Sequence, residues 1–349
     1  MLSAQNIPAG PPPTIITSCN TASFFKPFLA DTFKSSVYRK PSALRRIGII
    51  GSGKVGCSAA SFLLAEVDEI VLYDVVPRLP VGEALDLQNA AEALGLNVQV
   101  KGANDISVLH GLDVVVITAG FGRTPGMSRI DLLSKNLPIV EGLAKEYSGE
   151  KDRETVFIVV TNPVDVLTYV FWRRSGVDKQ RVAGLSGVLD SSRLKTIMRL
   201  SKGTRVSGLS SFVLGEHGEN MVILRDRMRR EYGLSDADLD LVLNETVRAA
   251  AEIISMKGAT VHGPGASIAR MVKAVLSDSR EVLPASAVLN GEYGIRNVCL
   301  GVPVETGRNG FKVVQEKLGE NEVAMLRRAA ENVLKALEKI GYGSGETMG

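Results

Sequence analysis

A histidine between two glycines is the residue in this sequence best suited to proton transfer. His217 lies in Leu-Gly-Glu-His-Gly, outside any apolar stripe. Imidazole titrates near neutral pH, so a nearby carboxylate would orient its ring and stabilise its charged form. Taken alone, such a histidine is more often an ordinary loop residue. The hypothesis of a proton carrier therefore depends on the other charged residues of the chain.

A carboxylate and an arginine three residues apart are candidate partners for this histidine. Asp190 and Arg193 lie in Leu-Asp-Ser-Ser-Arg, near the start of a predicted helix, where this spacing places them on one face. Asp190 is positioned to orient an imidazole, and Arg193 to bind an anion. The alternative is an acidic helix start that forms an ion pair with Arg193 and serves only stability.

Two further arginines lie six positions apart in a loop rich in glycine. Residues 120–129 read Gly-Phe-Gly-Arg-Thr-Pro-Gly-Met-Ser-Arg and follow a predicted strand, at the edge where open α/β sheets bind ligands. The small and rigid residues predict a mobile loop. Arg123 and Arg129 suit the capture of an anion because a guanidinium forks onto a carboxylate. Solvated surface arginines are the alternative interpretation of this loop.

A glycine-rich turn predicts a dinucleotide site. Its residues are Gly51, Ser52, Gly53, Lys54, Val55 and Gly56, and they follow an apolar strand and open a helix. Free N–H groups at such a helix start bind a pyrophosphate. Asp74 ends the next predicted strand, where its carboxylate would bind ribose hydroxyls and repel a 2′-phosphate. We therefore expect NAD, with NADP as the weaker alternative because Arg78 lies close by.

Strands that alternate with helices must position these residues. The apolar pattern predicts strands at 47–50, 70–73, 113–118 and 155–160 and helices at 54–66, 80–94, 131–147 and after Asn162-Pro163, which indicates βαβ units and a parallel sheet. The later pattern predicts helices at 190–200, 235–256, from 265 and at 320–339, with strands at 281–289 and 297–302. We expect an α/β fold, with a Rossmann doubly wound parallel sheet domain at 46–187 and an α+β catalytic domain at 188–345.

Composition excludes several other classes of protein. The 349 residues carry a net charge of +3, which is too small a basic field for nucleic-acid binding as the main activity. No run of about 18 apolar residues predicts a membrane span. Three histidines are too few for a histidine-rich metal site, so we expect no metal. The widely spaced cysteines, which are Cys19, Cys57 and Cys299, indicate free thiols in a reducing compartment.

The first 45 residues differ from the rest of the chain. They contain five basic residues and one acidic residue, six of the 14 prolines, and ten serines or threonines. This bias resembles an organellar transit peptide, although no arginine-rich amphipathic helix is evident. The alternatives are a disordered arm, or a translation start that has been assigned too far upstream. We expect a cytoplasmic protein, or an organellar one if residues 1–45 are a targeting segment.

Together these motifs resemble the lactate and malate dehydrogenase family, in family order and spacing, from about Arg46 to Ile340. The resemblance implies that His217 is the proton donor and acceptor, with Asp190 as its orienting carboxylate. It also implies that Arg193 binds the substrate's C1 carboxylate and that Arg129 polarises the reacting carbonyl. Asn162, in Thr-Asn-Pro-Val-Asp, would contact the substrate beside the nicotinamide. Asn162 is also expected at the cofactor, and the remaining residues expected there are Thr118, Ala119, Gly120, Asn136 and Val160.

Arg123 indicates which substrate the resemblance favours. Lactate dehydrogenases usually carry glutamine at this loop position, whereas malate dehydrogenases carry arginine. Oxaloacetate has a second carboxylate that needs a cation once water leaves, whereas pyruvate would leave the guanidinium unpaired, at a cost of ~2–5 kcal/mol. Thr260, in Lys-Gly-Ala-Thr, is also expected at the substrate, but it is at least as typical of lactate enzymes. We therefore predict malate dehydrogenase, with lactate dehydrogenase or a broad 2-keto acid reductase as the alternative.

The motifs Gly-Met-Ser-Arg and Asn-Pro-Val-Asp are most similar to those of the lactate-dehydrogenase-like malate dehydrogenases of archaea and some bacteria. That likeness implies a tricarboxylic acid cycle enzyme and a homo-oligomer, with a tetramer favoured over a dimer. Two more distant alternatives remain. An NAD-dependent glycosidase would need a divalent metal, but neither Cys57 nor Cys299 lies in a motif near a histidine. A nucleotide-binding structural protein would bind NADH without turnover.

Overall fold

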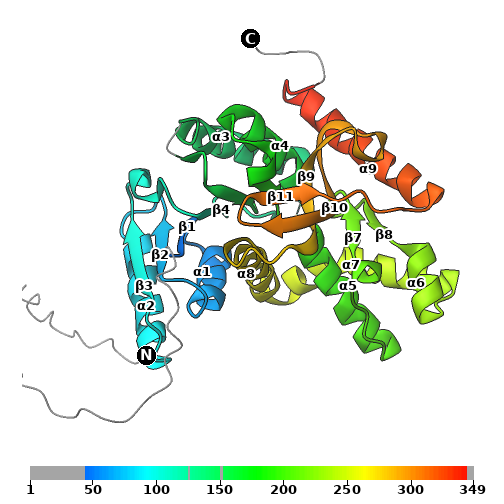
Figure 1. Ribbon diagram of the computed structural model, residues 1–349, viewed down its shortest axis with the longest axis horizontal. Coiled ribbons are helices and arrows are strands. Elements are labelled where there is room, and N and C mark those ends of the chain that lie inside the picture. Colours follow the sequence, from blue (N-terminus) through cyan, green and yellow to red (C-terminus); the bar gives the residue numbers. More distant parts are fainter. Residues whose placement is uncertain (1–43, 125, 150–151, 344–349) are drawn as a thin grey trace, which may run out of the picture. The chain divides into compact units, whose positions relative to one another are not determined.

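The computed structural model describes residues 44–124, 126–149 and 152–343 (Figure 1). The predicted extension over residues 1–45 therefore lies almost wholly outside the described residues. Contacts among the described residues make one compact unit and do not separate the predicted domains at 187/188. This boundary remains a prediction.

Six parallel strands form the first half of the sheet. They are β1 (Arg46–Ile50), β2 (Glu69–Tyr73), β3 (Gln99–Ala103), β4 (Val114–Ile117), β5 (Val156–Val159) and β6 (Val182–Gly184), in the order β3-β2-β1-β4-β5-β6. Their apolar runs are largely buried because helices cover a parallel sheet on both faces. The strand order reverses between β1 and β4, so a ligand crevice is expected at the carboxyl ends of these two strands. This is the Rossmann arrangement that the sequence predicted.

Helices connect these strands close to their predicted positions. They are α1 (Lys54–Leu63), α2 (Leu79–Ala93), α3 (Arg129–Glu146) and α4 (Val164–Ser175). The helix α1 ends three residues before its predicted end at 66. The helix α3 begins two residues before 131, because Ser128 caps it: the Ser128 hydroxyl accepts a hydrogen bond from Asp131 N at 3.1 Å. The loop 120–129 therefore ends with Arg129 already inside a helix.

The second half adds an antiparallel extension to the same sheet. Its elements are α5 (Gly187–Lys202), β7 (Val213–Gly215), β8 (Met221–Ile223), α6 (Arg225–Tyr232), α7 (Asp236–Lys257), α8 (His262–Leu276), β9 (Glu281–Asn290), β10 (Arg296–Gly307), β11 (Gly310–Val313) and α9 (Glu320–Lys339). The strand β9 pairs with β6 at Ser286 and Gly184, and the order continues β9-β10-β7-β8 with β11 beside β10. The β9–β10 hairpin turns over residues 291–295, between the two strands predicted at 281–289 and 297–302. The helix α8 starts three residues before its predicted start at 265.

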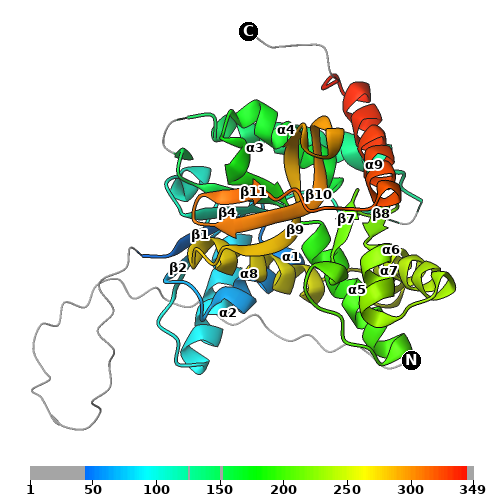
Figure 2. The ribbon, with the colours of Figure 1, turned by 45° about the vertical axis from the view of Figure 1, so that its right-hand side comes forward.

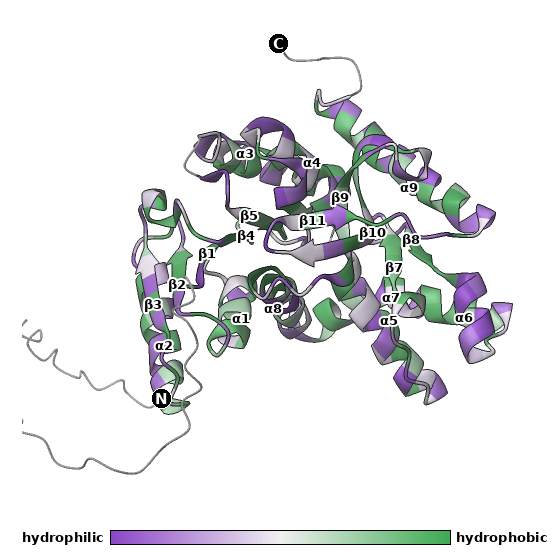
Figure 3. Cartoon of the chain, viewed as in Figure 1, coloured by the Kyte–Doolittle hydropathy of each residue, from purple (hydrophilic) through white to green (hydrophobic). Residues whose placement is uncertain are grey.

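Apolar side chains join the two halves into one large core, with a smaller second core beside it. Apolar residues concentrate along the sheet, while the outer faces of the helices are largely polar (Figure 3). The second core lies between α5, α6 and α7, which group near β7 and β8 in Figures 1 and 2. The helices α8 and α1 approach closely, since a Cβ at Gly265 would lie 2.4 Å from Ser58 Oγ. The helix that starts at the glycine-rich turn is thus packed against the second half.

The described residues show two absences. None of their helices is long and apolar enough to cross a membrane. In the same part of the chain, no group of three or more histidine, cysteine or acidic side chains is arranged to hold a metal ion.

Candidate active site

His217 and Asp190 meet although 27 residues separate them in the sequence. His217 lies in the turn between β7 and β8, and its Nδ1 is 2.7 Å from Asp190 Oδ2. Asp190 lies in the first turn of α5, and its side chain is only 2% exposed. Burial acts to lower the pKa of His217, but the charge and the hydrogen bond of Asp190 outweigh it and raise this pKa above its ordinary value. The arrangement therefore favours a charged imidazole near neutral pH.

Arg193 contacts the other oxygen of the same carboxylate. Its Nη1 donates to Asp190 Oδ1 at 2.9 Å, one turn along α5. The simple helical ion pair considered for the sequence is therefore present. It does not exclude anion binding, because a guanidinium has five N–H donors and this contact uses one of them.

Arg129 reaches the turn that carries His217. Its Nη1 lies 2.7 Å from Glu216 Oε1, and its Nη2 donates to the backbone oxygen of His217 at 2.9 Å. One end of the arginine loop thus lies beside the Asp190–His217 pair. Sequence reasoning missed Glu216, and its position next to His217 in the motif was the only signal for it.

Asp165, in the first turn of α4, is a second buried carboxylate that the sequence did not single out. Its Oδ2 accepts a hydrogen bond from His217 N at 2.8 Å, and its Oδ1 accepts one from Ser286 Oγ at 2.6 Å. Burial raises the pKa of Asp165 to about 6, although both hydrogen bonds act to lower it. Asp165 therefore anchors the His217 turn to α4 and to β9. It belongs to Asn-Pro-Val-Asp, where only Asn162 was assigned a role.

The other expected substrate residues lie in the segments that precede α3, α4 and α8. Arg123 is exposed on the loop, and its Nε donates to Met127 O at 3.0 Å. Asn162 precedes Pro163, which caps α4, and its Oδ1 accepts a hydrogen bond from Val164 N at 3.3 Å. Thr260 lies in the short turn between α7 and α8. Their roles toward a substrate remain predictions.

The glycine-rich turn packs tightly on one side and is open on the other. Gly51 adopts a φ of +102° and its Cα lies so close to β4's end that a Cβ would be 2.6 Å from Ala119 N. A Cβ at Gly56 would lie 2.1 Å from Gly51 O, so the loop and α1 pack tightly. At Gly53, in contrast, a Cβ would meet nothing within 4 Å. This open side, at the amino end of α1 where Lys54 and Val55 begin the helix, fits a bound dinucleotide.

Asp74 lies beside this turn, as expected for a ribose-binding carboxylate. Its Oδ2 accepts a hydrogen bond from Ser52 N at 2.8 Å, and its Oδ1 accepts one from Val76 N at 2.9 Å. Asn104, which the sequence did not indicate, donates to the backbone oxygens of Asp74 and Val76. The backbone N–H of Arg78 in turn donates to Asn104 Oδ1 at 3.1 Å. The loop that begins at Asp74 is therefore held by Asn104 as well as by its own carboxylate.

Asn136 ties together the loops at the carboxyl ends of β4 and β5. Its Oδ1 accepts from Phe121 N at 2.7 Å, and its Nδ2 donates to Phe121 O and, at 2.7 Å, to Asn162 O. Thr118 Oγ1 donates to Gly51 O at 2.8 Å. Thr118, Ala119 and Gly120 follow β4 directly, and Val160 follows β5. The fold thus brings the expected cofactor residues to one edge of the sheet.

Comparison with known proteins agrees with this arrangement. Residues 45–184 match the NAD-binding domain of lactate/malate dehydrogenases, and residues 187–341 match the alpha/beta C-terminal domain of the same family. The chain belongs to the lactate/malate dehydrogenase family. It is thus an NAD-dependent oxidoreductase with a Rossmann domain, as the resemblance implied.

Individual relatives span almost all of the described chain. Malate dehydrogenase of Archaeoglobus fulgidus is 40% identical over 299 residues, which are 85% of this chain and 100% of that protein. The structure of that enzyme in complex with NADH superimposes with a TM-score of 0.79 over the same shares of the two chains. The minor L-lactate dehydrogenase of Enterococcus mundtii is 32% identical, with a TM-score of 0.78 over 85% of this chain and 98% of that one. Family enzymes of both kinds are therefore similar to this chain.

Proposed function

We propose that this protein catalyses the reversible reduction of oxaloacetate to malate with NADH. The observation that carries the proposal is the contact of Asp190 with both His217 and Arg193, with Arg129 bound to the same turn as His217. This cluster unites a proton donor, a carboxylate to orient it and two guanidinium groups for an acidic substrate. Malate dehydrogenases are also the relatives that are 39–40% identical to this chain.

The proton is proposed to come from His217. Its Nδ1 is engaged by Asp190, so the ring is fixed and its Nε2 is the nitrogen left to face a substrate. A raised pKa keeps the imidazole charged, and Nε2–H would then donate to the keto oxygen as that oxygen becomes an alkoxide. Bound NADH would supply the hydride to the carbon. In the reverse direction, the neutral ring would accept the hydroxyl proton.

The three arginines are proposed to hold the substrate and its developing charge. Arg129, beside His217, would stabilise the developing alkoxide as a preorganised donor. Arg193 would bind the C1 carboxylate, while Arg123 would bind the second carboxylate when loop 120–129 closes over the substrate. In the structure Arg123 is exposed and bound to its own loop at Met127 O, so this last role requires the loop to move.

Lactate dehydrogenase is the second candidate function. Thr260 favours it, and a lactate dehydrogenase is among the similar structures. Arg123 argues against it, because a methyl group of pyruvate would leave the guanidinium without a partner in a closed site.

The decisive experiment compares kcat/KM for oxaloacetate and pyruvate with NADH, on the wild type and on Arg123→Gln. We expect a strong preference for oxaloacetate, which Arg123→Gln shifts toward pyruvate by about 30-fold or more. The exposed Lys145→Gln, which removes a cation from the far end of α3, is the matched control and should leave the ratio unchanged. Equal rates on both acids in the wild type, or an unchanged ratio in Arg123→Gln, would contradict the assignment.

Assembly and cellular role belong to the same proposal. We expect a homotetramer, with a homodimer as the alternative, because the sequence is similar to family members with these assemblies. A malate dehydrogenase would act in the tricarboxylic acid cycle, and we propose the cytoplasm as its location. The organellar alternative depends on residues 1–45.

A further inference from the structure

Glu216 is a nearly buried carboxylate that the proposed mechanism does not use. It follows β7 and directly precedes His217, and its side chain is 9% exposed. Its Oε1 lies 2.7 Å from Arg129 Nη1, and its Oε2 accepts a hydrogen bond from the side chain of Asn220. Burial of a charged carboxylate raises the free energy of the folded state unless a cation compensates its charge. Arg129 is the cation in contact with it.

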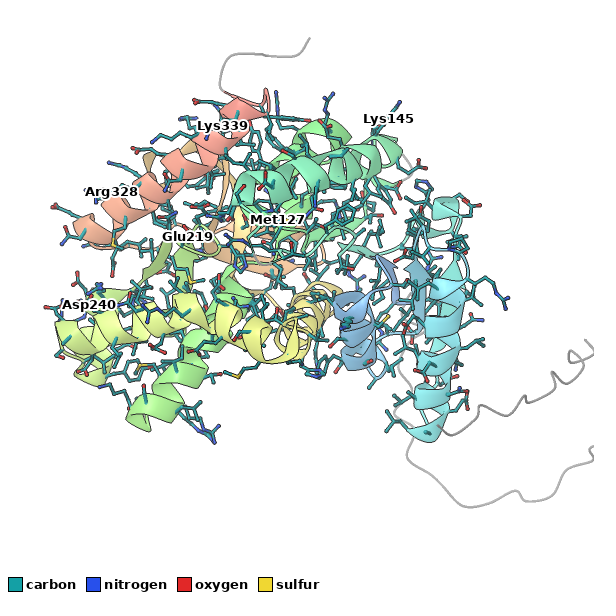
Figure 4. The ribbon with its side chains drawn as sticks, turned by 180° about the vertical axis from the view of Figure 1, so that it is seen from behind. Met127, Lys145, Glu219, Asp240, Arg328 and Lys339 are labelled. Atoms are coloured by element: carbon teal, nitrogen blue, oxygen red, sulfur yellow. The ribbon has the colours of Figure 1, made fainter. Side chains whose placement is uncertain are left out.

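The contact joins two distant parts of the chain. Arg129 is the first residue of α3 and ends the loop 120–129, whereas Glu216 and His217 lie in the turn between β7 and β8, almost ninety positions later. In Figure 4, Met127 marks the loop and Glu219 marks this turn, and both labels lie in the central part of the view. The ion pair is therefore one of two direct contacts between the loop arginine and the segment of the proton donor.

Two contacts orient the guanidinium of Arg129. Nη1 is bound by Glu216 Oε1, while Nη2 donates to the backbone oxygen of His217 at 2.9 Å. A planar group held at two of its nitrogens cannot rotate freely, so its other N–H groups keep a fixed direction relative to His217. This matters because polarising donors act best when they need no reorientation during the reaction.

We propose that Glu216 is a positioning residue that holds Arg129 beside His217 for polarisation of the substrate carbonyl. This inference rests on the proposed function, in which Arg129 stabilises the developing alkoxide. In this role Glu216 acts through Arg129 rather than by its own contact with substrate or cofactor. Its loss should therefore slow the chemical step and leave cofactor binding unchanged.

The first test compares Glu216→Gln with Glu219→Gln in the full-length chain. Glu219 lies on the same turn but is exposed, so it is a matched control for the loss of one carboxylate. We expect Glu216→Gln to lower kcat for oxaloacetate by about 10- to 100-fold, the scale of a misplaced catalytic group. The Kd of NADH, measured by fluorescence titration, should change less than about twofold. Glu216→Asp keeps the charge, so its kcat should lie between those of Glu216→Gln and the wild type. If Glu216→Gln fails to fold, Glu216→Asp takes its place in the comparison with Glu219→Gln.

A double-mutant cycle separates positioning from a general structural role. In an Arg129→Lys background the forked contact is already lost, so Glu216→Gln should lower kcat much less than it does in the wild type. Equal effects in both backgrounds would overturn the proposal, as would a Glu216→Gln enzyme as fast as Glu219→Gln or faster than the wild type. A wild type that prefers pyruvate would contradict the malate assignment alone. The same cycle would then be measured with pyruvate, because Arg129 is proposed to contact the carbonyl that both acids share.

Discussion

At the scale of single residues, Asp190 controls the charge of His217. Burial alone would lower the pKa of this histidine, and Asp190 reverses the direction of the shift. Asp190→Asn keeps a hydrogen-bond acceptor for Nδ1 but removes the charge, so burial should dominate and the pKa of His217 should fall. Reduction of oxaloacetate needs the charged ring, and its kcat/KM should therefore decline at a lower pH than in the wild type.

The pH profiles of both directions check this prediction. At pH 7.5 we expect Asp190→Asn to lose roughly 10²-fold in oxaloacetate reduction, less than or equal to the ~10²–10⁴-fold loss expected for His217→Asn. The acid limb of malate oxidation, which needs the neutral ring, should also move to lower pH. Glu219→Gln is the control. A pH profile of Asp190→Asn that coincides with that of the wild type would show that Asp190 does not set the charge of His217.

The motifs predicted the residues that are proposed to react at this site but not the contacts that support them. The contact of His217 with Asp190 was expected from two short motifs and their resemblance to a known family, because their residue types alone also allow an ordinary loop histidine and a helical ion pair. Glu216 and Asp165 were missed because a carboxylate has a special role only through its partners. Those partners, Arg129 for Glu216 and Ser286 for Asp165, are brought near by the folding of distant segments. Sequence spacing along one element carries no signal for such contacts.

At the scale of elements, His110 connects segments at the end of the sheet opposite the active site. Its Nδ1 lies 2.7 Å from Asp152 Oδ2 and its Nε2 lies 3.1 Å from Glu146 Oε1, at the end of α3. Asp152 also accepts a hydrogen bond from Gly111 N at 2.9 Å, and the imidazole packs against Tyr147. The structure shows His110 bound by two carboxylates from the region between α3 and β5.

The charge of His110 should make stability depend on pH. Burial acts to lower its pKa, but hydrogen bonds to Asp152 and Glu146 outweigh it and raise the pKa above 6.5. A raised histidine pKa stabilises the folded state fully below the unfolded value of about 6.5, and this stabilisation is lost as the pH rises through the folded value. We therefore expect His110→Gln to reduce the loss of unfolding free energy between pH 6 and pH 8.5.

Urea denaturation at the two pH values measures this difference. His262→Gln is the matched control, because His262 is exposed at the start of α8. The ring contact with Tyr147 is also lost in His110→Gln, but that loss should be the same at both pH values. If the unfolding free energy falls by the same amount from pH 6 to pH 8.5 in the wild type and in His110→Gln, the two carboxylates do not hold a proton on His110.

The elements that the sequence predicted best were long or strongly apolar. Helix α9 spans its predicted residues, and β1, β2, β4 and β5 lie within two residues of theirs. The strands β6, β7 and β8 have three residues each, too few for an alternating or helical pattern to emerge. Strand β3 reads Gln-Val-Lys-Gly-Ala at the edge of the sheet and has no regular apolar pattern, and its residues are exposed or half-buried. These short elements form through pairing with neighbours that only the whole fold supplies.

At the scale of the whole molecule, the two predicted domains share one sheet. The pairing of Gly184 with Ser286 makes β9 the antiparallel neighbour of β6 in this sheet. Ser286 also donates to Asp165, which in turn holds the turn of His217. The junction between the halves therefore lies next to the site, and the sequence could not indicate it because a single strand pairing has no pattern. A site built across a junction is sensitive to anything that moves one half, including a second subunit.

An apolar row on α2 favours assembly of this chain. Val81 and Leu85, four residues apart on one helical face, are 42% and 64% exposed, while Ala84 and Leu87 pack inward. Contiguous exposed apolar patches mark interaction sites, and we propose that this row is part of an interface between subunits. We expect light scattering of the full-length chain to show a tetramer or a dimer, and Leu85→Glu to weaken the association at least about tenfold, because burial of an unpaired charge opposes it. Val108→Glu, at another exposed apolar residue, should leave the mass unchanged.

A wild-type chain with the mass of a monomer at micromolar concentration would refute the predicted assembly. An unchanged mass for Leu85→Glu would instead place the interface on another face, because assembly would persist with a charge on α2.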